Sequence, residues 1–173
     1  MTPLLLASCT LRPYRQGDQA ALVRNANDAT LFRNMTDRFP HPYTADAADA
    51  WVALNVGSPA HDNLAIEIGG EVAGGIGIVP GTDVHRRSAE IGYWLGAPYR
   101  GRGIATEALR AMTDHVFATR DVCRLFAGVY EHNAASARVL EKADYRFEGR
   151  LRKSVTKAGQ TIDTLLYARV LEA

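Results

Sequence analysis

The stretch SAEIGYWLGAPYRGRGIA, residues 88–105, joins a strand pattern to a glycine-rich turn and the start of a helix. Residues Ser88 to Leu95 fit a strand, in which successive side chains point to opposite faces of the sheet. One face of this strand carries Ala89, Ile91, Tyr93 and Leu95, and the other carries Glu90, Gly92 and Trp94. Beyond the glycines, apolar residues recur at helical spacing, so we predict an amphipathic helix from Ile104 to about Phe117.

Two further strands are predicted upstream of this stretch. Leu64–Ile68 and Val72–Val79 are rich in apolar and β-branched residues, and they flank Gly69-Gly70, which is typical of a hairpin turn. We therefore expect residues 64–68, 72–79 and 88–95 to form consecutive antiparallel strands.

The N-terminal part of the chain predicts a short strand and two helices. The strand contains Leu11-Arg12-Pro13, and Asp18 is the expected cap of a helix that ends near Asn27. Thr44 is the expected cap of a second helix, in which Trp51 lies at helical spacing from other apolar residues and is expected in the core.

The C-terminal part predicts a strand from Arg124 to Tyr130 and a short helix from about Asn133 to near Lys142. A closing hairpin follows, with strands at Tyr145–Leu151 and Ile162–Val170 around the turn Lys157-Ala158-Gly159-Gln160. The predicted order is β-α-α-β-β-β-α-β-α-β-β. It indicates one domain over residues 1–173 with an α+β (mixed α/β) fold: a central, mixed, mostly antiparallel sheet of about seven strands, with helices on both faces.

Composition excludes several classes of protein. The net charge is +1 and no long basic tract occurs, so we expect no nucleic-acid partner. Cys9 and Cys123 lack metal-type spacing and predict free thiols, and the five histidines give no metal ligand pattern. The apolar run at residues 4–7 is too short for a signal peptide or a membrane span, so we expect a cytoplasmic protein without a membrane partner.

The turn Arg100-Gly101-Arg102-Gly103-Ile104-Ala105 is the sharpest local signal. Glycines allow a tight turn and a close approach of the backbone to a ligand. The first amides of the following helix have no partner within the helix, and the helix dipole adds positive potential there. A diphosphate fits this environment, with added charge from Arg100 and Arg102. The alternative interpretation is a plain glycine-rich turn with two solvated arginines.

At this point the sequence resembles the GNAT superfamily of N-acetyltransferases. The family pattern Gln/Arg-x-x-Gly-x-Gly/Ala is matched by Arg100, Gly103 and Ala105. An ordered set of further segments is similar to the ribosomal-protein N-terminal acetyltransferase branch and spans nearly the whole chain. These segments are Leu11-Arg12-Pro13, Pro42-Tyr43-Thr44, Ala50-Trp51, residues 90–95, Glu131-His132-Asn133, Ser136, residues 140–143, Glu148-Gly149-Arg150, Asp163, Leu166 and Tyr167.

The resemblance implies acetyl-CoA as the donor. It implies that backbone amides of residues 100–105 hold the pyrophosphate, and that the strand ending at Trp94-Leu95 splays from the strand at 124–130. The pantetheine arm would lie in that gap, where it would pair with exposed backbone groups, and Asn133 would contact the pantetheine or the thioester. The cofactor-binding residues implied are Trp94, Leu95, Arg100, Gly101, Arg102, Gly103, Ile104, Ala105, Asn133 and Ser136.

The sequence departs from the family pattern at two places. Many relatives have a tyrosine as general acid seven residues after the asparagine, where this chain has Leu140. A serine at position 136 is characteristic of the ribosomal-protein branch, and we expect Ser136 to stabilise or protonate the leaving thiolate. The alternative interpretation is an ordinary serine in the first turn of a helix. Asp144 stands where relatives usually have glycine, and we expect it to adopt a left-handed helix C-cap.

The chemistry is attack of a neutral amine on a thioester. A lysine-like amine costs roughly 4–5 kcal/mol to deprotonate at neutral pH and an α-amine only about 1 kcal/mol, so one carboxylate acting through water suffices for an α-amine. Glu90, on the strand that leads into the turn, is the candidate base, and a solvated surface charge is the alternative. Asn133 is equally well explained as a helix cap.

Four residues are candidates for contact with the acceptor amine. His41 and Tyr43 lie in the region that shapes the acceptor site in relatives. Tyr130 and Tyr167 are candidates for the lining of an acceptor tunnel, with a core position as the alternative.

Two classes of function stay open at this stage. The first is an enzyme that transfers an acetyl group to a primary amine: a protein or peptide N-terminus, or a small molecule such as an antibiotic, a polyamine or an amino acid. The second is a non-catalytic acyl-CoA-binding module. The sequence leaves open whether the chain is a monomer or a homodimer.

Overall fold

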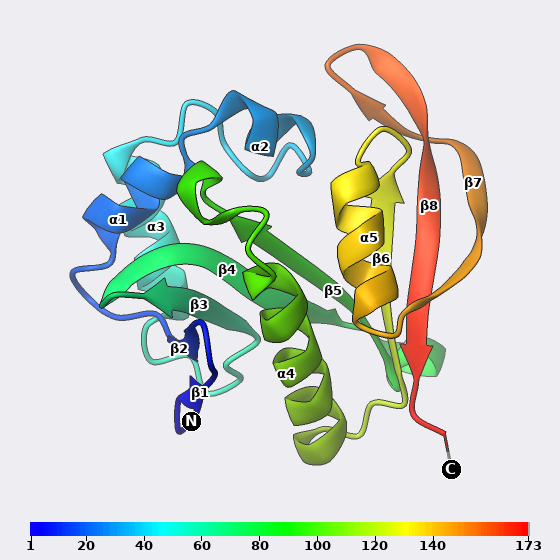
Figure 1. Cartoon of the computed structure of the whole chain (residues 1–173), viewed down its shortest axis with the longest axis horizontal. Coiled ribbons are helices and arrows are strands. Elements are labelled where there is room, and N and C mark those ends of the chain that lie inside the picture. Colours follow the sequence, from blue (N-terminus) through cyan, green and yellow to red (C-terminus); the bar gives the residue numbers. More distant parts are fainter. Residues whose placement is uncertain (173) are drawn as a thin grey trace.

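A computed structural model describes residues 1–172 of the chain, and Ala173, included in the predicted domain, lies outside the described residues. The strands form one eight-stranded sheet in the order β1-β2-β3-β4-β5-β6-β8-β7 (Figure 1). The pair β5–β6 is parallel, and the other neighbouring pairs are antiparallel. The predicted α+β class with a mixed, mostly antiparallel sheet is confirmed, with eight strands in place of about seven.

The predicted order of strands and α-helices is also confirmed, with one short strand and one short α-helix added. The strands are β1 (Leu4–Leu5), β2 (Thr10–Pro13), β3 (Asn63–Ile68), β4 (Glu71–Pro80), β5 (Ser88–Leu95), β6 (Arg124–Tyr130), β7 (Arg146–Lys157) and β8 (Gln160–Val170). The α-helices are α1 (Gln19–Ala26), α2 (Ala29–Arg33), α3 (Ala45–Asn55), α4 (Ile104–Thr119) and α5 (Ala134–Lys142).

Helices cover both faces of the sheet, as expected, and each face has its own core. On one face, α4 and α5 pack on the sheet through fully buried residues such as Ile104, Leu109 and Leu140. On the other face, α1 and α3 bury Leu22 and Val52 against the sheet. Each such side chain contributes roughly 1.5–3 kcal/mol through removal from water.

Two elements differ from the sequence predictions because they are very short. β1 has two residues, which pair with Leu11 and Thr10, and α2 has five. Neither is long enough to show a hydrophobic period. Helix α2 is instead set by its N-cap, since the Asp28 side chain accepts a hydrogen bond from the backbone N–H of Thr30 at 2.7 Å.

The expected side-chain cap of Asp18 is wrong. Asp18 occupies the N-cap position of α1 but makes no side-chain cap bond. Its two carboxylate oxygens accept hydrogen bonds from the buried guanidinium of Arg12, each at 2.8 Å. A buried arginine without a paired charge is strongly destabilising. Pairing Asp18 with Arg12 therefore contributes more to stability than a side-chain cap of α1 would. By contrast, the Thr44 cap is present, with its hydroxyl 3.2 Å from the N–H of Ala47.

Candidate active site

The strands β5 and β6 diverge and leave a cleft between them. They pair at Ser88↔Arg124, Ala89↔Leu125 and Glu90↔Phe126, and each then continues without the other, β5 to Leu95 and β6 to Tyr130. The other edge of each strand is occupied, by β4 and by β8. The edges that face each other therefore offer free backbone groups to a cleft of about 620 Å³.

The glycine-rich turn stands at one end of this cleft. Gly101 and Gly103 have φ values of 75° and 80°, a left-handed backbone conformation that residues with a Cβ rarely adopt. Gly103 is the N-cap of α4, and no side chain caps the helix. A Cβ added to either glycine would meet no atom within 4 Å, so open space lies beside the turn. The amides of the first turn of α4 are thus accessible to an anion.

The side chain of Arg100 lines the cleft and also forms bonds within the protein. Its Nε donates to the Leu95 carbonyl at 2.8 Å, its Nη1 donates to the Thr30 hydroxyl at 3.0 Å, and its Nη2 lies 2.8 Å from Asp28. Arg100 therefore ties the turn to α2. The exposed cations that line the same end of the cleft are Arg102, from the turn, and Arg138 and Lys142, from α5.

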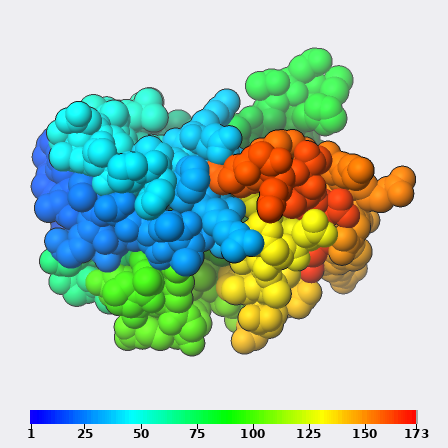
Figure 2. Space-filling view, turned by 90° about the horizontal axis from the view of Figure 1, so that it is seen from above, coloured from blue at the N-terminus to red at the C-terminus, as the bar shows by residue number. Residues whose placement is uncertain are grey.

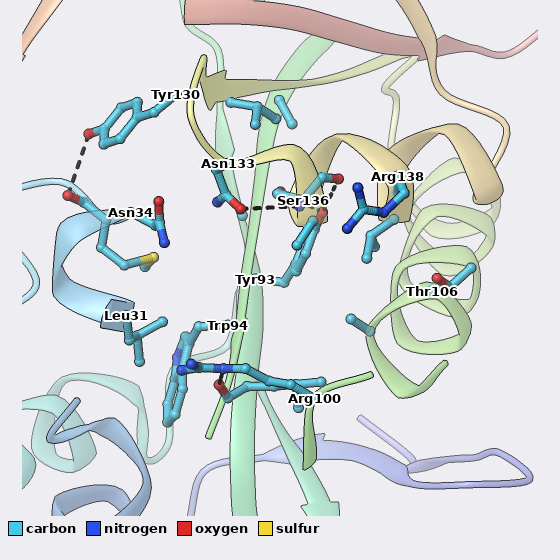
Figure 3. Close-up of a pocket in the computed structure, with 18 of the residues that line it drawn as sticks. Leu31, Asn34, Tyr93, Trp94, Arg100, Thr106, Tyr130, Asn133, Ser136 and Arg138 are labelled. Carbon is cyan, nitrogen blue, oxygen red and sulfur yellow. Dashed lines mark hydrogen bonds between the residues drawn. The ribbon is translucent and has the colours of Figure 1, made fainter. Parts of the chain in front are cut away.

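The first turn of α5 brings together Asn133, Ser136 and a residue of β5 (Figure 3). The Oδ1 atom of Asn133 accepts a hydrogen bond from the Ser136 N–H at 3.2 Å, so Asn133 does cap the helix. The Ser136 hydroxyl lies 2.9 Å from the hydroxyl of Tyr93. Burial raises the pKa of Tyr93 to about 12. Leu140, at the position of the tyrosine of many relatives, is fully buried.

Glu90 lies at the fork where β5 and β6 separate. It is the last β5 residue that pairs with β6, its side chain is exposed, and it lines the cleft. Tyr130, at the end of β6, lines the same region, and its hydroxyl is 3.4 Å from the Met35 carbonyl. Burial, with a smaller effect of the carboxylates of Asp37 and Glu90, raises the pKa of Tyr130.

A family model described as an acetyltransferase (GNAT) domain matches residues 9–146. The chain belongs to the GNAT acetyltransferase family. The matched residues run from before β2 to the start of β7 and so include both diverging strands, the glycine-rich turn and the first turn of α5.

Curated relatives of this acetyltransferase include N-acetyltransferases of Bacillus subtilis and Escherichia coli. A probable N-acetyltransferase, YjcK of Bacillus subtilis, is 45% identical over 69 residues, which is 40% of this chain and 38% of that protein. The match therefore spans less than half of YjcK. A spermidine N(1)-acetyltransferase of Escherichia coli is 27% identical over 146 residues, 83% of this chain and 76% of that protein.

Two solved structures resemble the acetyltransferase over nearly its whole length. A GNAT-family acetyltransferase of Bacillus anthracis has a TM-score of 0.87 and 22% identity, and the match covers 99% of this chain and 100% of that one. Mycobacterium smegmatis RimJ, in complex with CoA-disulfide, has a TM-score of 0.79 and 32% identity over 98% of this chain and 86% of that one.

Helix α2 and the residues after it form a roof over the cleft of the acetyltransferase, from Arg100 of the turn to Tyr130 at the end of β6. Lys157, buried near the end of β7, places its Nζ 2.6 Å from Asp37 and 3.6 Å from the centre of the Phe32 ring. His132 bonds to Asn34 at 3.0 Å. Figure 2 shows the light-blue residues after α2 meeting the orange β7–β8 turn. These contacts connect residues about 100 positions apart, so no local pattern in the sequence signals them.

Three of the residues proposed for acceptor contact lie outside the lining of the cleft. His41 is exposed and stacks on Phe32, with ring centroids 5.4 Å apart. Tyr43 is buried in the core beneath α1 and α3. Tyr167 is buried in the other core, and its hydroxyl donates to Glu141 at 3.0 Å. Of the four candidates, the structure brings Tyr130 to the cleft.

Trp94 and Leu95 line the cleft, but their side chains serve the two cores. Trp94 packs with α1 and α3, and Leu95 packs beneath α4. Both are less than a tenth exposed, at 8% and 7%. What they present to the cleft is therefore mainly the backbone of β5.

Two absences hold for residues 1–172. No group of three or more histidine, cysteine, aspartate or glutamate side chains could hold a metal ion there. Across the same residues, no helix combines the length and the apolar character needed to span a membrane.

Proposed function

We propose that this acetyltransferase transfers the acetyl group of acetyl-CoA to the α-amine of a protein or peptide N-terminus. The observation that carries the proposal is the charge of the cleft. Among the described residues that line it, Glu90 is the one carboxylate. A polyamine carries several positive charges at neutral pH and calls for several carboxylates, whereas an α-amine carries at most one.

The opposite end of the cleft suits the donor. The open space beside the glycine-rich turn and the first amides of α4 fit a diphosphate. Arg102, Arg138 and Lys142 add positive charge for the phosphates. The free edges of β5 and β6 would hydrogen-bond the pantetheine arm, and the arm would lead the thioester toward Glu90 and Ser136.

The proposed chemistry needs few groups. The α-amine, with a pKa of about 7.7–8.0, is partly neutral at neutral pH. Glu90, through a water molecule, accepts the proton that the amine loses as it attacks the thioester carbon. The Ser136 hydroxyl donates to the sulfur as the carbon–sulfur bond breaks. Tyr130, at the mouth of the cleft, contacts the first residue of the acceptor.

The names of relatives support this choice of acceptor without deciding it. A ribosomal-protein-serine acetyltransferase of Escherichia coli is 30% identical over 87 residues, 50% of this chain and 49% of that protein, whereas another relative acts on spermidine. The single carboxylate of the cleft favours the former. A polyamine acceptor and a non-catalytic acyl-CoA-binding role are the competing outcomes of the test.

Release of free thiol from acetyl-CoA tests the proposal. The acceptors are hexapeptides that begin with serine or alanine, the same peptides with an Nα-acetyl group, and spermidine. We expect release with the free peptides and none with the blocked ones. Faster release with spermidine would replace the proposed acceptor with a polyamine. Tight binding of CoA in calorimetry without turnover of any acceptor would favour the binding module.

A further inference from the structure

Two hydroxyl groups from opposite sides of the cleft meet at the first turn of α5. Tyr93 reaches from β5 toward α5, and its oxygen lies 2.9 Å from Oγ of Ser136 and 3.2 Å from the backbone carbonyl oxygen of Ser136 (Figure 3). Both residues line the cleft and both are half-buried. The contact joins elements that are 43 positions apart in the sequence.

Each hydroxyl has one proton to donate, and this limits the pair to two arrangements. In the first, Tyr93 donates to the Ser136 carbonyl and Ser136 donates to Tyr93, so neither proton points to a third atom. In the second, Tyr93 donates to Oγ of Ser136, and the Ser136 proton is free to point into the cleft. A thioester sulfur that accepts a hydrogen bond from Ser136 selects the second arrangement.

We propose that Tyr93 is a positioning residue that holds Ser136 as a donor and supplies, through it, the proton for the leaving thiol. The proposal rests on the acetyl transfer proposed above. As the carbon–sulfur bond breaks, its electron pair goes to the sulfur, which takes the Ser136 proton. Oγ of Ser136 takes the proton of Tyr93, and water returns a proton to the phenolate. The proton that the amine loses through Glu90 enters the same solvent, so charges and atoms balance.

The chemical reason for a second hydroxyl is the weakness of serine as an acid. A serine alkoxide left without a proton source would reverse the transfer, whereas the phenol of Tyr93, even with its pKa raised by burial to about 12, is a stronger acid than a serine hydroxyl. Leu140 is fully buried and has no hydroxyl, so the pair at Ser136 takes the place of a single tyrosine donor on α5.

The test compares Tyr93→Phe with Tyr145→Phe. Tyr145 is a matched control, because its phenol also bonds to a hydroxyl, that of Thr113 at 2.7 Å, and burial also raises its pKa to about 12. Tyr145 does not line the cleft. With acetyl-CoA and the serine-initiated hexapeptide, we expect Tyr93→Phe to lower kcat by about 10- to 100-fold and to change KM for acetyl-CoA by less than about 2-fold. Tyr145→Phe should retain kcat within about 2-fold.

A double variant separates this role from a purely structural one. Because the two hydroxyls act as a unit, Tyr93→Phe combined with Ser136→Ala should be no slower than the slower single variant. The solvent deuterium isotope effect on kcat should fall in Tyr93→Phe, since one of two protons in motion is lost. Calorimetry with CoA verifies that each variant keeps its donor site.

Three results would overturn the inference while leaving the proposed function intact. The first is a kcat of Tyr93→Phe equal to that of the wild type, and the second is an equal loss of kcat in Tyr93→Phe and Tyr145→Phe. The third is a loss of kcat in the double variant equal to the product of the losses in the two single variants. A wild type that releases no thiol with any acceptor removes the proposed function, and the role of Tyr93 falls with it.

Discussion

Gly103 adopts a left-handed backbone at the entrance of α4 and faces open space, so a methyl group there would have two effects. It would strain the backbone by about 1–2 kcal/mol and would fill part of the open space beside the turn, where we propose that the diphosphate lies. We predict that Gly103→Ala weakens acetyl-CoA binding at least about 10-fold in calorimetry. Gly57→Ala is the control, since Gly57 has a similar φ of 74° and an open surrounding but does not line the cleft. Equal affinity in the two variants would contradict an anion site in the turn.

Glu90 is the second residue whose substitution should have a specific effect. Glu90→Gln keeps the shape of the side chain and removes the base, so kcat/KM for the peptide should fall by about 100-fold at neutral pH, with little change in acetyl-CoA affinity. The loss should shrink at higher pH, where the α-amine is already neutral. The matched control is Glu71→Gln, an exposed carboxylate of β4 outside the cleft. A loss that is the same at every pH would indicate a role other than proton transfer.

At the residue scale, sequence reasoning succeeded where a side chain acts on its near neighbours. The glycines of the turn, the Asn133 cap and the left-handed Asp144, with φ of 65°, follow from local backbone rules. It failed for contacts between distant residues. The pairing of Tyr93 with Ser136 and the tie from Arg100 to Asp28 depend on how β5, α5 and α2 pack, which no spacing in the sequence records.

At the element scale, the roof formed by α2 and the following residues offers a clear test. Lys157 holds the roof through Asp37 and the ring of Phe32, and its side chain is buried. Lys157→Met keeps the apolar stem and removes the charge, so residues 34–38 should lose hydrogen-exchange protection and KM for the peptide should rise several-fold. Acetyl-CoA affinity should stay unchanged.

Lys153→Met provides the control for this experiment, since Lys153 lies on the same strand with an exposed side chain. If Lys157→Met leaves both the exchange of residues 34–38 and the peptide KM at wild-type values, the roof does not shape acceptor binding.

Elements differ in how well the sequence predicts them, for a physical reason. Helix α4 has sixteen residues with apolar side chains at helical spacing, so its existence and its buried face follow from the sequence. Strand β1 and helix α2 have two and five residues and depend on their partners. Strand β7 begins as predicted but extends to Lys157. Its register with β8 shifts between Phe147 and Gly149 and between Leu151 and Val155, and the pairing resumes after each shift.

At the scale of the whole molecule, the two cores keep the cleft open. The end of β5 is fixed to β4 by the pairs Gly75↔Trp94 and Gly74↔Leu95. Trp94 is then buried in one core and Leu95 in the other, so the strand end is held from both faces of the sheet. Closing β5 onto β6 would require both side chains to leave their cores. The divergence is therefore a property of the fold and does not depend on a ligand.

The ion pair between Arg124 of β6 and Glu148 of β7 makes the stability of the sheet depend on pH. Hydrogen bonds from Arg124, opposed by burial, lower the pKa of Glu148 from its ordinary value of 4.5. Near that pH the folded chain then binds fewer protons than the unfolded chain. The contribution of the pair is present above pH 4.5 and is lost as the pH falls through the lowered pKa.

Glu148→Gln should therefore destabilise the protein at neutral pH, by up to about 1 kcal/mol for a partly exposed pair. At about pH 3.5, below the ordinary value of 4.5, the carboxylate is largely protonated in the unfolded chain, so the difference from the variant should be smaller there. Urea unfolding at both pH values measures it. Glu172→Gln, at a position without an ion pair within residues 1–172, controls for the loss of one negative charge. A difference between Glu148→Gln and the wild type that grows as the pH falls would reverse the sign and rule out the proposed linkage.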